Sequence, residues 1–431
     1  MKRRKKRKYQ PVTTKDILAQ GQGLLAKFSV PFSPDRAGPL TTPILVKSAQ
    51  RAIVSTYDRG ELLDFDLAGG AFIAGHAPRN VMLAVKKTAE RRLFSAPIIQ
   101  SEIHVARLIS NQIPSCESLY FFGDQIQAME QSLKAVARLK QKTMVLIVEG
   151  CSSLEPFIEE CFQPDARKKR CWQGQGRWAG ITCLRLGLND LRNIRVIFEE
   201  FHEQIAAVFV EPVGTHAGIR LLPPDVLELL RQLTTANDTA LIFDEIHTAF
   251  HTRHFSIQNE IGISPDLTCF GSLIGGGFPL GALGGSRAFM RECAVYFSPS
   301  TPSAIVMQAS LAFLKMLNED FYIGLSKKGE MVESRLKEMF GVHALSYDVA
   351  RYGPLLSLFQ KGNGTIEKAC LPAQDYFLMR EHLLRSNILF PHRQTEPFTV
   401  SVVHSKKQIN CLIDNLLLFF KRLDKNDKDK G

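Results

Sequence analysis

The stretch from Ala240 to Gly285 decides the fold of this chain. It begins ALIFDEIHTAF (240–250) and ends SPDLTCFGSLIGGGFPLGALGG (264–285). The apolar run 240–243 ends on two carboxylates, Asp244 and Glu245, which is typical of a buried parallel strand whose C-terminal end faces a ligand. A second apolar run, 267–270, leads into a block of three glycines, a backbone that is costly unless φ is positive or a ligand approaches closely. The stretch therefore predicts an α/β fold with a ligand at the strand ends.

Neighbouring segments extend this pattern. Residues 143–148 and 205–210 are further apolar strands, and 191–202 and 226–233 are helical in pattern. Pro224 suits the first turn of the second helix. Alternation of strands and helices predicts a doubly wound, largely parallel sheet.

Composition limits the class of protein. The chain has 431 residues, of which 45% are hydrophobic and 23% charged, as in ordinary globular proteins. It has no apolar run of membrane-spanning length and no apolar region after its basic N-terminus, so we expect neither a membrane span nor a signal peptide. Nine cysteines without a C-x-x-C pair predict reduced thiols in the cytoplasm and no metal site.

The positive charge is concentrated at the N-terminus. Lys2–Lys8 supplies seven charges, and without them the net charge falls from +11 to +4. A basic run of this kind binds nucleic acid or is simply a solvated tail. No interleaved aromatic residues support nucleic-acid binding, so we favour the solvated tail.

The motif around Asp244 resembles one known family. A strand ending in FDE, then PDL, then G-Lys-x-I-G-G-G-x-P-x-G-A-x-G-G resembles the centre of class III pyridoxal-phosphate aminotransferases, and the glutamate-1-semialdehyde 2,1-aminomutases match best. The resemblance extends from about residue 22 to 404. It implies the pyridoxal-phosphate-dependent transferase fold type I: a large domain with a mostly parallel sheet flanked by helices, and a small α+β domain from the N- and C-terminal segments.

The resemblance also implies a division of the chain. We expect a basic tail at 1–10, the N-terminal part of the small domain at 11–70 and the large cofactor-type domain at 71–296. The C-terminal part of the small domain would be 297–424, followed by a tail at 425–431.

Two family positions define the expected chemistry. Asp244 falls on the aspartate that pairs with the pyridine nitrogen of pyridoxal phosphate or pyridoxamine phosphate. Ser272 falls on the lysine that forms the Schiff base and moves the proton. A hydroxyl forms no aldimine and is a poor base near neutral pH.

Other family contacts are changed. In SLYFFGDQIQAMEQ (118–131), Gln and Ile side chains replace small residues of the phosphate cradle, and Gly123 could form a different turn there with Asp124. Ser152 takes the place of the stacking tyrosine. His216 replaces the asparagine beside the cofactor oxygen, and Ser300 lies where a threonine reaches the partner subunit's cofactor phosphate.

Substrate-binding positions are better kept. Arg36, in PFSPDRAG (31–38), falls on the arginine that grips the substrate carboxylate. Glu396 falls on a glutamate near the mouth of the family's active site. Without the resemblance, a surface arginine and a hydrogen-bonded strand end explain these two residues equally well.

Three interpretations follow. In the first, the chain is a catalytically impaired scaffold that has lost its cofactor, with a small amino or keto acid as ligand, and pairs with itself or with an active relative. In the second, it is a diverged aminomutase or aminotransferase that uses pyridoxamine phosphate with His216 or another base, and as an aminomutase it would convert glutamate-1-semialdehyde to 5-aminolevulinate. In the third, the basic tail makes it a nucleic-acid-associated protein. The joint loss of several cofactor contacts favours the first.

Overall fold

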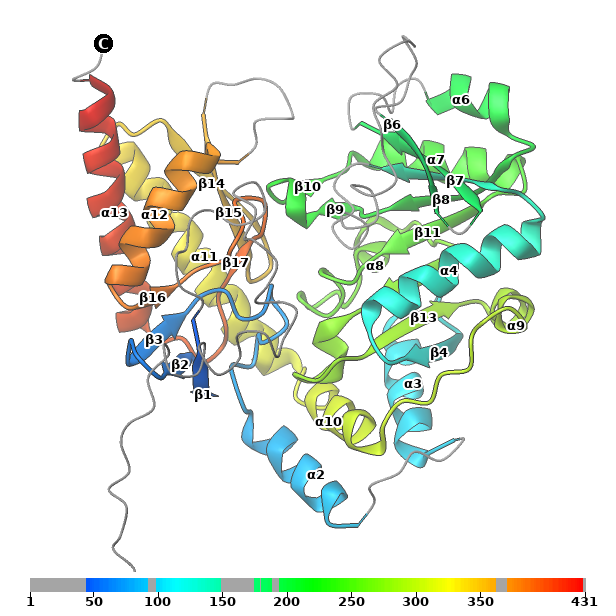
Figure 1. Cartoon of the computed structure of the whole chain (residues 1–431), viewed down its shortest axis with the longest axis horizontal. Coiled ribbons are helices and arrows are strands. Elements are labelled where there is room, and N and C mark those ends of the chain that lie inside the picture. The colour runs from blue at the N-terminus through cyan, green and yellow to red at the C-terminus, as the bar shows by residue number, and fades with distance from the viewer. Residues whose placement is uncertain are drawn as a thin grey trace, which may run out of the picture.

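The computed structural model describes residues 44–91, 98–148, 174–178, 180–187, 194–361 and 370–428. Within them the chain forms two lobes (Figure 1). One lobe contains a large sheet and its helices, and the other contains two small sheets packed on three helices. None of the described helices is both long and apolar enough to cross a membrane.

The large sheet has eight strands in the order β4-β13-β12-β11-β8-β5-β7-β6. The five strands from β12 to β7 are mutually parallel, and β13 runs against its neighbours β12 and β4. The sequence prediction of a mostly parallel sheet is therefore confirmed. The strands are β4 (Ser118–Phe122), β5 (Met144–Val148), β6 (Gly174–Trp178), β7 (Ile181–Leu186), β8 (Ile205–Val210), β11 (Ala240–Asp244), β12 (Leu267–Phe270) and β13 (Gly281–Gly285).

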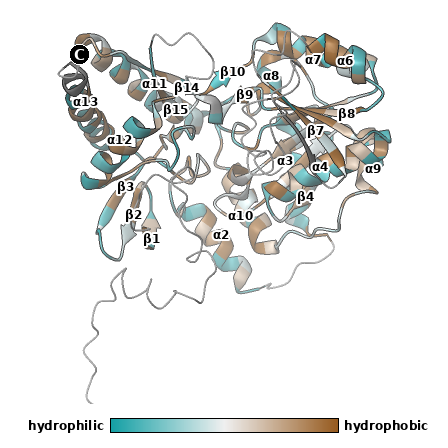
Figure 2. Cartoon of the chain, turned by 45° about the horizontal axis from the view of Figure 1, so that its top comes forward, coloured by the Kyte–Doolittle hydropathy of each residue, from teal (hydrophilic) through white to brown (hydrophobic). Residues whose placement is uncertain are grey.

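Both faces of this sheet are buried, which explains its continuous apolar strands. Along β11, Ile242 packs into the core beneath α4, whereas Leu241 and Phe243 pack into the core beneath α6 and α7. Hydrophobic and hydrophilic residues alternate along these helices, as expected for helices with one buried side (Figure 2). The helices and short elements of this lobe are α2 (Arg79–Ala89), α3 (Gln100–Gln112), α4 (Gln125–Lys140), α6 (Ile194–Phe201), β9 (Val213–Gly214), η4 (Thr215–Ala217), β10 (Arg220–Leu221), α7 (Pro224–Ala236), α8 (Ile257–Ile261), η5 (Ser272–Gly275), α9 (Arg287–Ala294) and α10 (Ala304–Leu314).

The small lobe joins the two ends of the described chain. Its four-stranded sheet has the order β1-β2-β3-β16. In it β16 pairs in parallel with β3, although Ile388 comes 325 positions after its partner Leu63 in the sequence. A three-stranded sheet, β14-β15-β17, and three helices complete its core. The elements are β1 (Val46–Gln50), β2 (Ile53–Thr56), β3 (Glu61–Asp64), α11 (Glu319–Val342), β14 (Tyr347–Tyr352), β15 (Leu355–Gln360), α12 (Ala373–Arg385), β16 (Ile388–Leu389), β17 (Phe398–Thr399) and α13 (Lys406–Lys428).

The helix α10 bears on the proposed division of the chain. It packs on α2 and α3 and against η5, that is, on the large lobe. The boundary between the large domain and the C-terminal part of the small domain at 296/297 stays a proposal. Assigning α10 to the large domain would move this boundary to a position after Leu314.

Candidate functional site

The candidate site lies where three parallel strands end side by side. The pairing of Asp244 with Cys269 and of Phe243 with Val210 aligns the C-terminal ends of β11, β12 and β8. The residues that follow these ends are Glu245, the pair Gly271-Ser272 and Glu211. The sheet therefore brings the positions of Asp244 and Ser272 to one edge, as in the ligand site of open α/β sheets.

Close packing joins this edge to the start of α4. A Cβ atom added to Gly271 would lie 2.4 Å from Ile246 Cγ2 and 3.1 Å from Gln125 Cβ. The turn before Ser272, the loop after Asp244 and the N-terminus of α4 thus meet at one point. The structure describes the backbone of Ser272, which begins η5, and not its side chain.

Asp244 is buried, with 1% of its surface exposed. Its Oδ1 accepts a hydrogen bond from the backbone N–H of Ile246 at 3.1 Å. Its negative charge raises the pKa of the neighbouring Glu245 carboxyl and Cys269 thiol, after the larger effect of burial on each. A buried carboxylate in this position suits a cationic ring nitrogen, so this residue fits the cofactor that the resemblance implies.

Glu245 has a structural role instead. It accepts hydrogen bonds from Ser256 Oγ at 2.5 Å, Gln258 Nε2 at 2.9 Å and the backbone N–H of Ile257 at 3.0 Å. Burial raises the pKa of Glu245 although these three donors oppose the rise. The carboxyl group therefore ties the loop after β11 to the start of α8.

The predicted phosphate cradle is filled by the protein's own acceptors. The backbone N–H of Gly123 donates to Gln127 Oε1 at 3.0 Å, and the N–H of Gln127 donates to Asp124 Oδ1 at 2.8 Å. Asp124 is thereby the N-cap of α4. It also places a carboxylate where a phosphate would lie, and two such anions repel each other. These residues do not fit a cofactor phosphate.

His216 is held by a chain of hydrogen bonds from the end of β8. Thr215 Oγ1 donates to Glu211 Oε1 at 2.6 Å and lies 3.1 Å from His216 Nδ1. Because the one hydroxyl proton points to the carboxylate, Nδ1 carries the proton of the imidazole and Nε2 is left as an acceptor. Burial, then the nearby His247 and Arg393, hold the pKa of His216 well below its ordinary value, so the ring is neutral.

A second imidazole lies beside it. The ring centroids of His216 and His247 are 5.1 Å apart. Burial lowers the pKa of His247 to about 4, with a further contribution from His251. In the described part of the chain, no group of three or more His, Cys, Asp or Glu side chains is arranged to hold a metal ion.

The remaining predicted residues have different surroundings. Glu396 Oε2 accepts from the backbone N–H groups of His392 at 3.0 Å and Arg393 at 3.1 Å, so it closes the turn 392–396. Ser300 is half-buried in the loop between α9 and α10. Ser152 and Arg36 lie outside the described residues. The binding roles of all four stay predictions.

Sequence reasoning missed Arg393 and Asp66. The positive charge of Arg393, in the small lobe, lowers the pKa of His216. The backbone of Gly69, three residues after Asp66, forms a hydrogen bond with His247. Loops from the two lobes therefore meet over the histidine pair. No local pattern marks these residues, because the contacts join segments more than 140 positions apart in the sequence.

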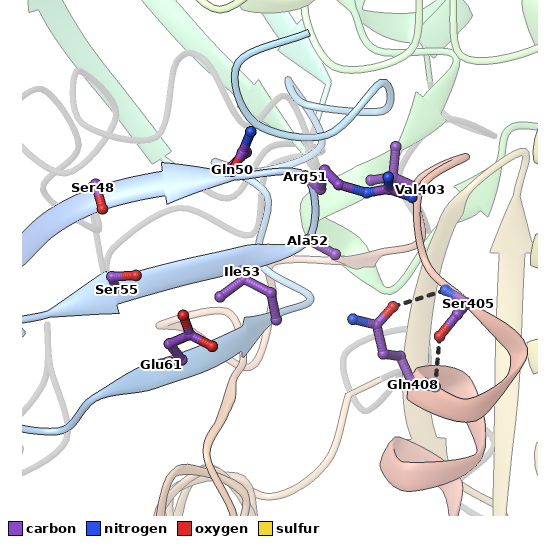
Figure 3. A pocket seen from close by; sticks show the side chains of 10 residues that line it. All are labelled: Ser48, Gln50, Arg51, Ala52, Ile53, Ser55, Glu61, Val403, Ser405 and Gln408. Atoms are coloured by element: carbon purple, nitrogen blue, oxygen red, sulfur yellow. Dashed lines mark hydrogen bonds between the residues drawn. The ribbon is translucent and has the colours of Figure 1, made fainter.

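A separate hollow of about 430 Å³ lies between the β1–β2 hairpin and the start of α13 (Figure 3). There Ser405 N donates to Gln408 Oε1 at 2.8 Å and Gln408 N donates to Ser405 Oγ at 3.2 Å. This capping box already satisfies the backbone amides of Ser405 and Gln408 at the start of α13. The hollow is lined by β1, β2 and α13 and not by the strand ends that carry Asp244.

Asp66 gives the site a testable dependence on pH. Burial, then Asp64 and Glu396, raise the pKa of Asp66 from 3.8 to about 7, against the opposing effects of the Gly69 amide and Arg380. The unfolded chain ionises this carboxyl near pH 4, whereas the folded chain does so near pH 7. The free energy of unfolding therefore falls as the pH rises between these two values.

We expect Asp66→Asn to remove this loss. Relative to the wild type, the variant should gain about 2 kcal/mol between pH 4 and pH 7.5, a value that allows for solvent screening of a half-buried group. Urea unfolding at a series of pH values measures the difference. A wild-type–variant difference that is constant over this range would show that the carboxyl titrates normally.

Comparison with known proteins agrees with this geometry. The family described as aminotransferase class-III matches residues 183–386. Glutamate-1-semialdehyde 2,1-aminomutase 2 of Bacillus anthracis is 28% identical over 393 residues, which cover 86% of this chain and 89% of the relative. The protein of the same name from Halalkalibacterium halodurans is 29% identical over 409 residues, covering 89% and 92%.

Solved structures share the fold. An omega-transaminase from Sphaerobacter thermophilus has a TM-score of 0.80 at 21% identity, with 95% of this chain and 97% of that chain covered. A glutamate-1-semialdehyde-aminomutase from Pseudomonas aeruginosa PAO1 has a TM-score of 0.79 at 18% identity, covering 95% and 94%. A lysine-to-alanine variant of the latter, in complex with PMP, has a TM-score of 0.78 at 17% identity, covering 94% and 93%.

Residues 183–386 thus match the class III aminotransferase family, and the chain shares its fold with a solved transaminase. The two relatives described above, and two of the structural neighbours, are named glutamate-1-semialdehyde aminomutases. Both expectations from the sequence, the family resemblance and the fold class, are confirmed.

Proposed function

We propose that this chain is a catalytically inactive relative of the aminomutases that acts as a binding or regulatory subunit. The observation that carries the proposal is the filled phosphate cradle. The backbone amides of Gly123 and Gln127, at the start of α4, are bonded to the Gln127 and Asp124 side chains, so a phosphate that used these amides would have to displace two hydrogen bonds and face a carboxylate. The loss of the lysine at position 272 removes the second anchor of the cofactor.

The proposal extends to partners and location. The family builds its active site between two subunits, so the chain would form a homodimer or pair with an active relative. Its ligand would be a small amino or keto acid, bound without covalent chemistry. We place it in the cytoplasm, where its cysteines stay reduced, and we assign no nucleic-acid partner to the basic tail.

The test restores the two lost cofactor contacts in turn, first the lysine at position 272 and then the free phosphate cradle. Pyridoxal phosphate is added to the wild type, to Ser272→Lys and to Ser272→Lys combined with Asp124→Ser and Gln127→Ala, and the visible absorbance of an aldimine is followed. We expect no stable band in the wild type and a weak band in the single variant. The triple variant should bind the cofactor at least about tenfold more tightly than the single variant, because its cradle amides are free and the carboxylate is gone.

Gln112→Ala is the matched control for truncation of a glutamine. Gln112 is exposed at the end of α3, outside the cradle. Added to Ser272→Lys, it should leave the affinity for pyridoxal phosphate unchanged. Equal affinity in the single and triple variants would contradict the idea that the filled cradle excludes the phosphate.

A second candidate function rests on the Glu211–Thr215–His216 chain. Its neutral imidazole with an acceptor Nε2 is equipped to move a proton in place of lysine. The alternative function is therefore a diverged aminomutase that converts glutamate-1-semialdehyde to 5-aminolevulinate with pyridoxamine phosphate. Formation of 5-aminolevulinate that is lost in His216→Gln would establish this function and exclude the first.

A further inference from the structure

A cavity of about 640 Å³ lies between the loop after β11 and the small lobe. One wall consists of residues 251–254 and Glu260 of α8, and the opposite wall is one side of α11. The end of β14 and the turn after it, residues 351–353, close a third side. The cavity shares no lining residue with the hollow of Figure 3. Its volume is in the range of small-molecule sites.

The two lobes approach each other closely at this cavity. Gly353 has a φ of +57°, and a Cβ atom there would lie 2.8 Å from His251 O and 3.1 Å from Thr252 Cγ2. The turn after β14 is therefore pressed against the loop after β11. This contact places the Thr252 hydroxyl near the phenol of Tyr352, and both residues line the cavity.

The two hydroxyl oxygens, Thr252 Oγ1 and Tyr352 OH, are buried. In the part of the chain that the structure describes, neither has a hydrogen-bond partner of normal geometry. A hydroxyl oxygen accepts as well as donates, so each can serve a donor that enters the cavity. Two such oxygens side by side form a polar spot in a cavity whose walls also include Leu325.

The surroundings of the phenol are negative. Burial raises the pKa of Tyr352, the carboxylates Glu245 and Glu260 raise it further, and the nearby Thr252 opposes the rise. Both charges that act on the phenol are thus carboxylates. Glu245 is bonded to three donors of its own loop and of α8, whereas Glu260 is exposed and lines the cavity. Glu260 is therefore the carboxylate that a ligand in the cavity can meet.

The charges of the whole lining point the same way. Apart from two histidines, the ionisable side chains with full charges are Arg253, Glu260, Glu319, Lys327, Glu330 and Arg351. Arg351 is ion-paired through its Nε with Glu333, which lies outside the lining. The other five are three carboxylates and two cations, a net charge of −1. A monocation would balance this charge.

We propose that this cavity binds the primary ammonium group of a small organic amine, with Glu260 as its counter-ion and the hydroxyls of Thr252 and Tyr352 as further acceptors. An ammonium group has three N–H donors, which match one carboxylate and two hydroxyl oxygens. Ile323, of which 45% is exposed on the α11 wall, offers an apolar surface to an alkyl chain. The inference does not depend on the proposed function, since it involves neither Ser272 nor the cradle at α4.

The test uses n-butylammonium chloride on the full chain at constant ionic strength. Butyltrimethylammonium keeps the charge and loses the N–H donors, and sodium valerate carries a carboxylate alone. Binding is measured by calorimetry and by the shift in melting temperature. We expect n-butylammonium to raise the melting temperature by about 2 °C at ten times its Kd. Butyltrimethylammonium should bind at least about tenfold more weakly, because it donates no hydrogen bond, and valerate should have no effect.

L-Norvaline identifies the source of the ammonium group, because it is n-butylamine with a carboxylate added. Tighter binding of L-norvaline than of n-butylammonium would assign the site to an amino acid, whose carboxylate would reach Arg253 or Lys327. Weaker binding would assign it to a simple amine. Either result supports an ammonium site in this cavity.

Variants of the lining locate the binding. Glu260→Gln should weaken n-butylammonium binding at least about tenfold and leave the melting temperature without ligand unchanged, since the side chain is exposed. Glu338→Gln, exposed on α11 and outside the cavity, should change neither property. Tyr352→Phe should also weaken binding, and without ligand it should melt no lower than the wild type, because it removes a buried hydroxyl without a good hydrogen bond.

Three results would overturn the proposal. The first is the absence of any n-butylammonium effect on the wild type. The second is equal affinity of Glu260→Gln and the wild type for n-butylammonium, which would place the amine elsewhere. The third is binding of valerate as tight as that of n-butylammonium, which would show that the cavity does not select a cation. If Tyr352→Phe fails to fold, Glu260→Gln and the wild-type titrations still decide among these results.

Discussion

Replacing Gly281 by alanine is expected to lower the free energy of unfolding by about 4 kcal/mol or more, or to prevent folding. Gly281 begins β13, which is paired on both sides with β12 and β4. A Cβ atom there would lie 2.1 Å from Asp124 O and 2.8 Å from Gln125 N. These are backbone atoms at the capped start of α4, so no side-chain rotation relieves the overlap.

Gly324→Ala provides the matched control. Gly324 lies in α11, and an added Cβ would meet nothing within 4 Å. The same substitution there should raise the free energy of unfolding by about 0.5–1 kcal/mol, because alanine favours the helix. Urea unfolding of the two variants gives both values. Equal effects would mean that the contact between β13 and the start of α4 is looser than described.

The second large effect is expected for Glu245→Ala. This change removes the acceptor of three buried donors, on Ser256, Ile257 and Gln258, and should cost about 3–5 kcal/mol. Glu245→Gln keeps the shape and one acceptor oxygen, so its cost should be about 1–2 kcal/mol. Denaturant unfolding near neutral pH measures both variants.

The two variants of Glu245 also differ from the wild type in their pH dependence. Burial raises the pKa of Glu245 above its ordinary value of 4.5. The wild type therefore loses stability relative to Glu245→Gln as the pH rises above about 4.5, since the unfolded chain ionises first. If the wild type instead became more stable relative to Glu245→Gln as the pH rises, the three hydrogen-bond donors would lower the pKa of Glu245 by more than burial raises it.

The sequence predicted the large sheet well. Strands 205–210, 240–244 and 267–270 appear as β8, β11 and β12, because parallel strands buried on both faces are apolar throughout. The helix expected at 226–233 is α7, Pro224–Ala236, and it extends beyond the predicted range at both ends. Pattern alone does not locate such ends, because the last turn depends on tertiary contacts.

The site was less predictable. Sequence comparison indicated a crowded cradle at 125–128, but the hydrogen bond from Gly123 to Gln127 depends on a side-chain conformation that no local pattern specifies. The cluster of Asp66, Arg380 and Glu396 joins segments that are far apart in the sequence and lie together only after the two lobes fold. Arg380 can be recognised in the sequence, because it is a charged residue among the apolar residues on the buried side of α12.

The most direct test of the central claim is borohydride reduction of the wild-type protein mixed with an equimolar amount of pyridoxal phosphate, followed by mass spectrometry of its peptides. The account predicts at most scattered, substoichiometric labelling of surface lysines, since position 272 offers no amine and the cradle amides are already bonded. One lysine labelled stoichiometrically, in a protein that also forms 5-aminolevulinate from glutamate-1-semialdehyde, would contradict it.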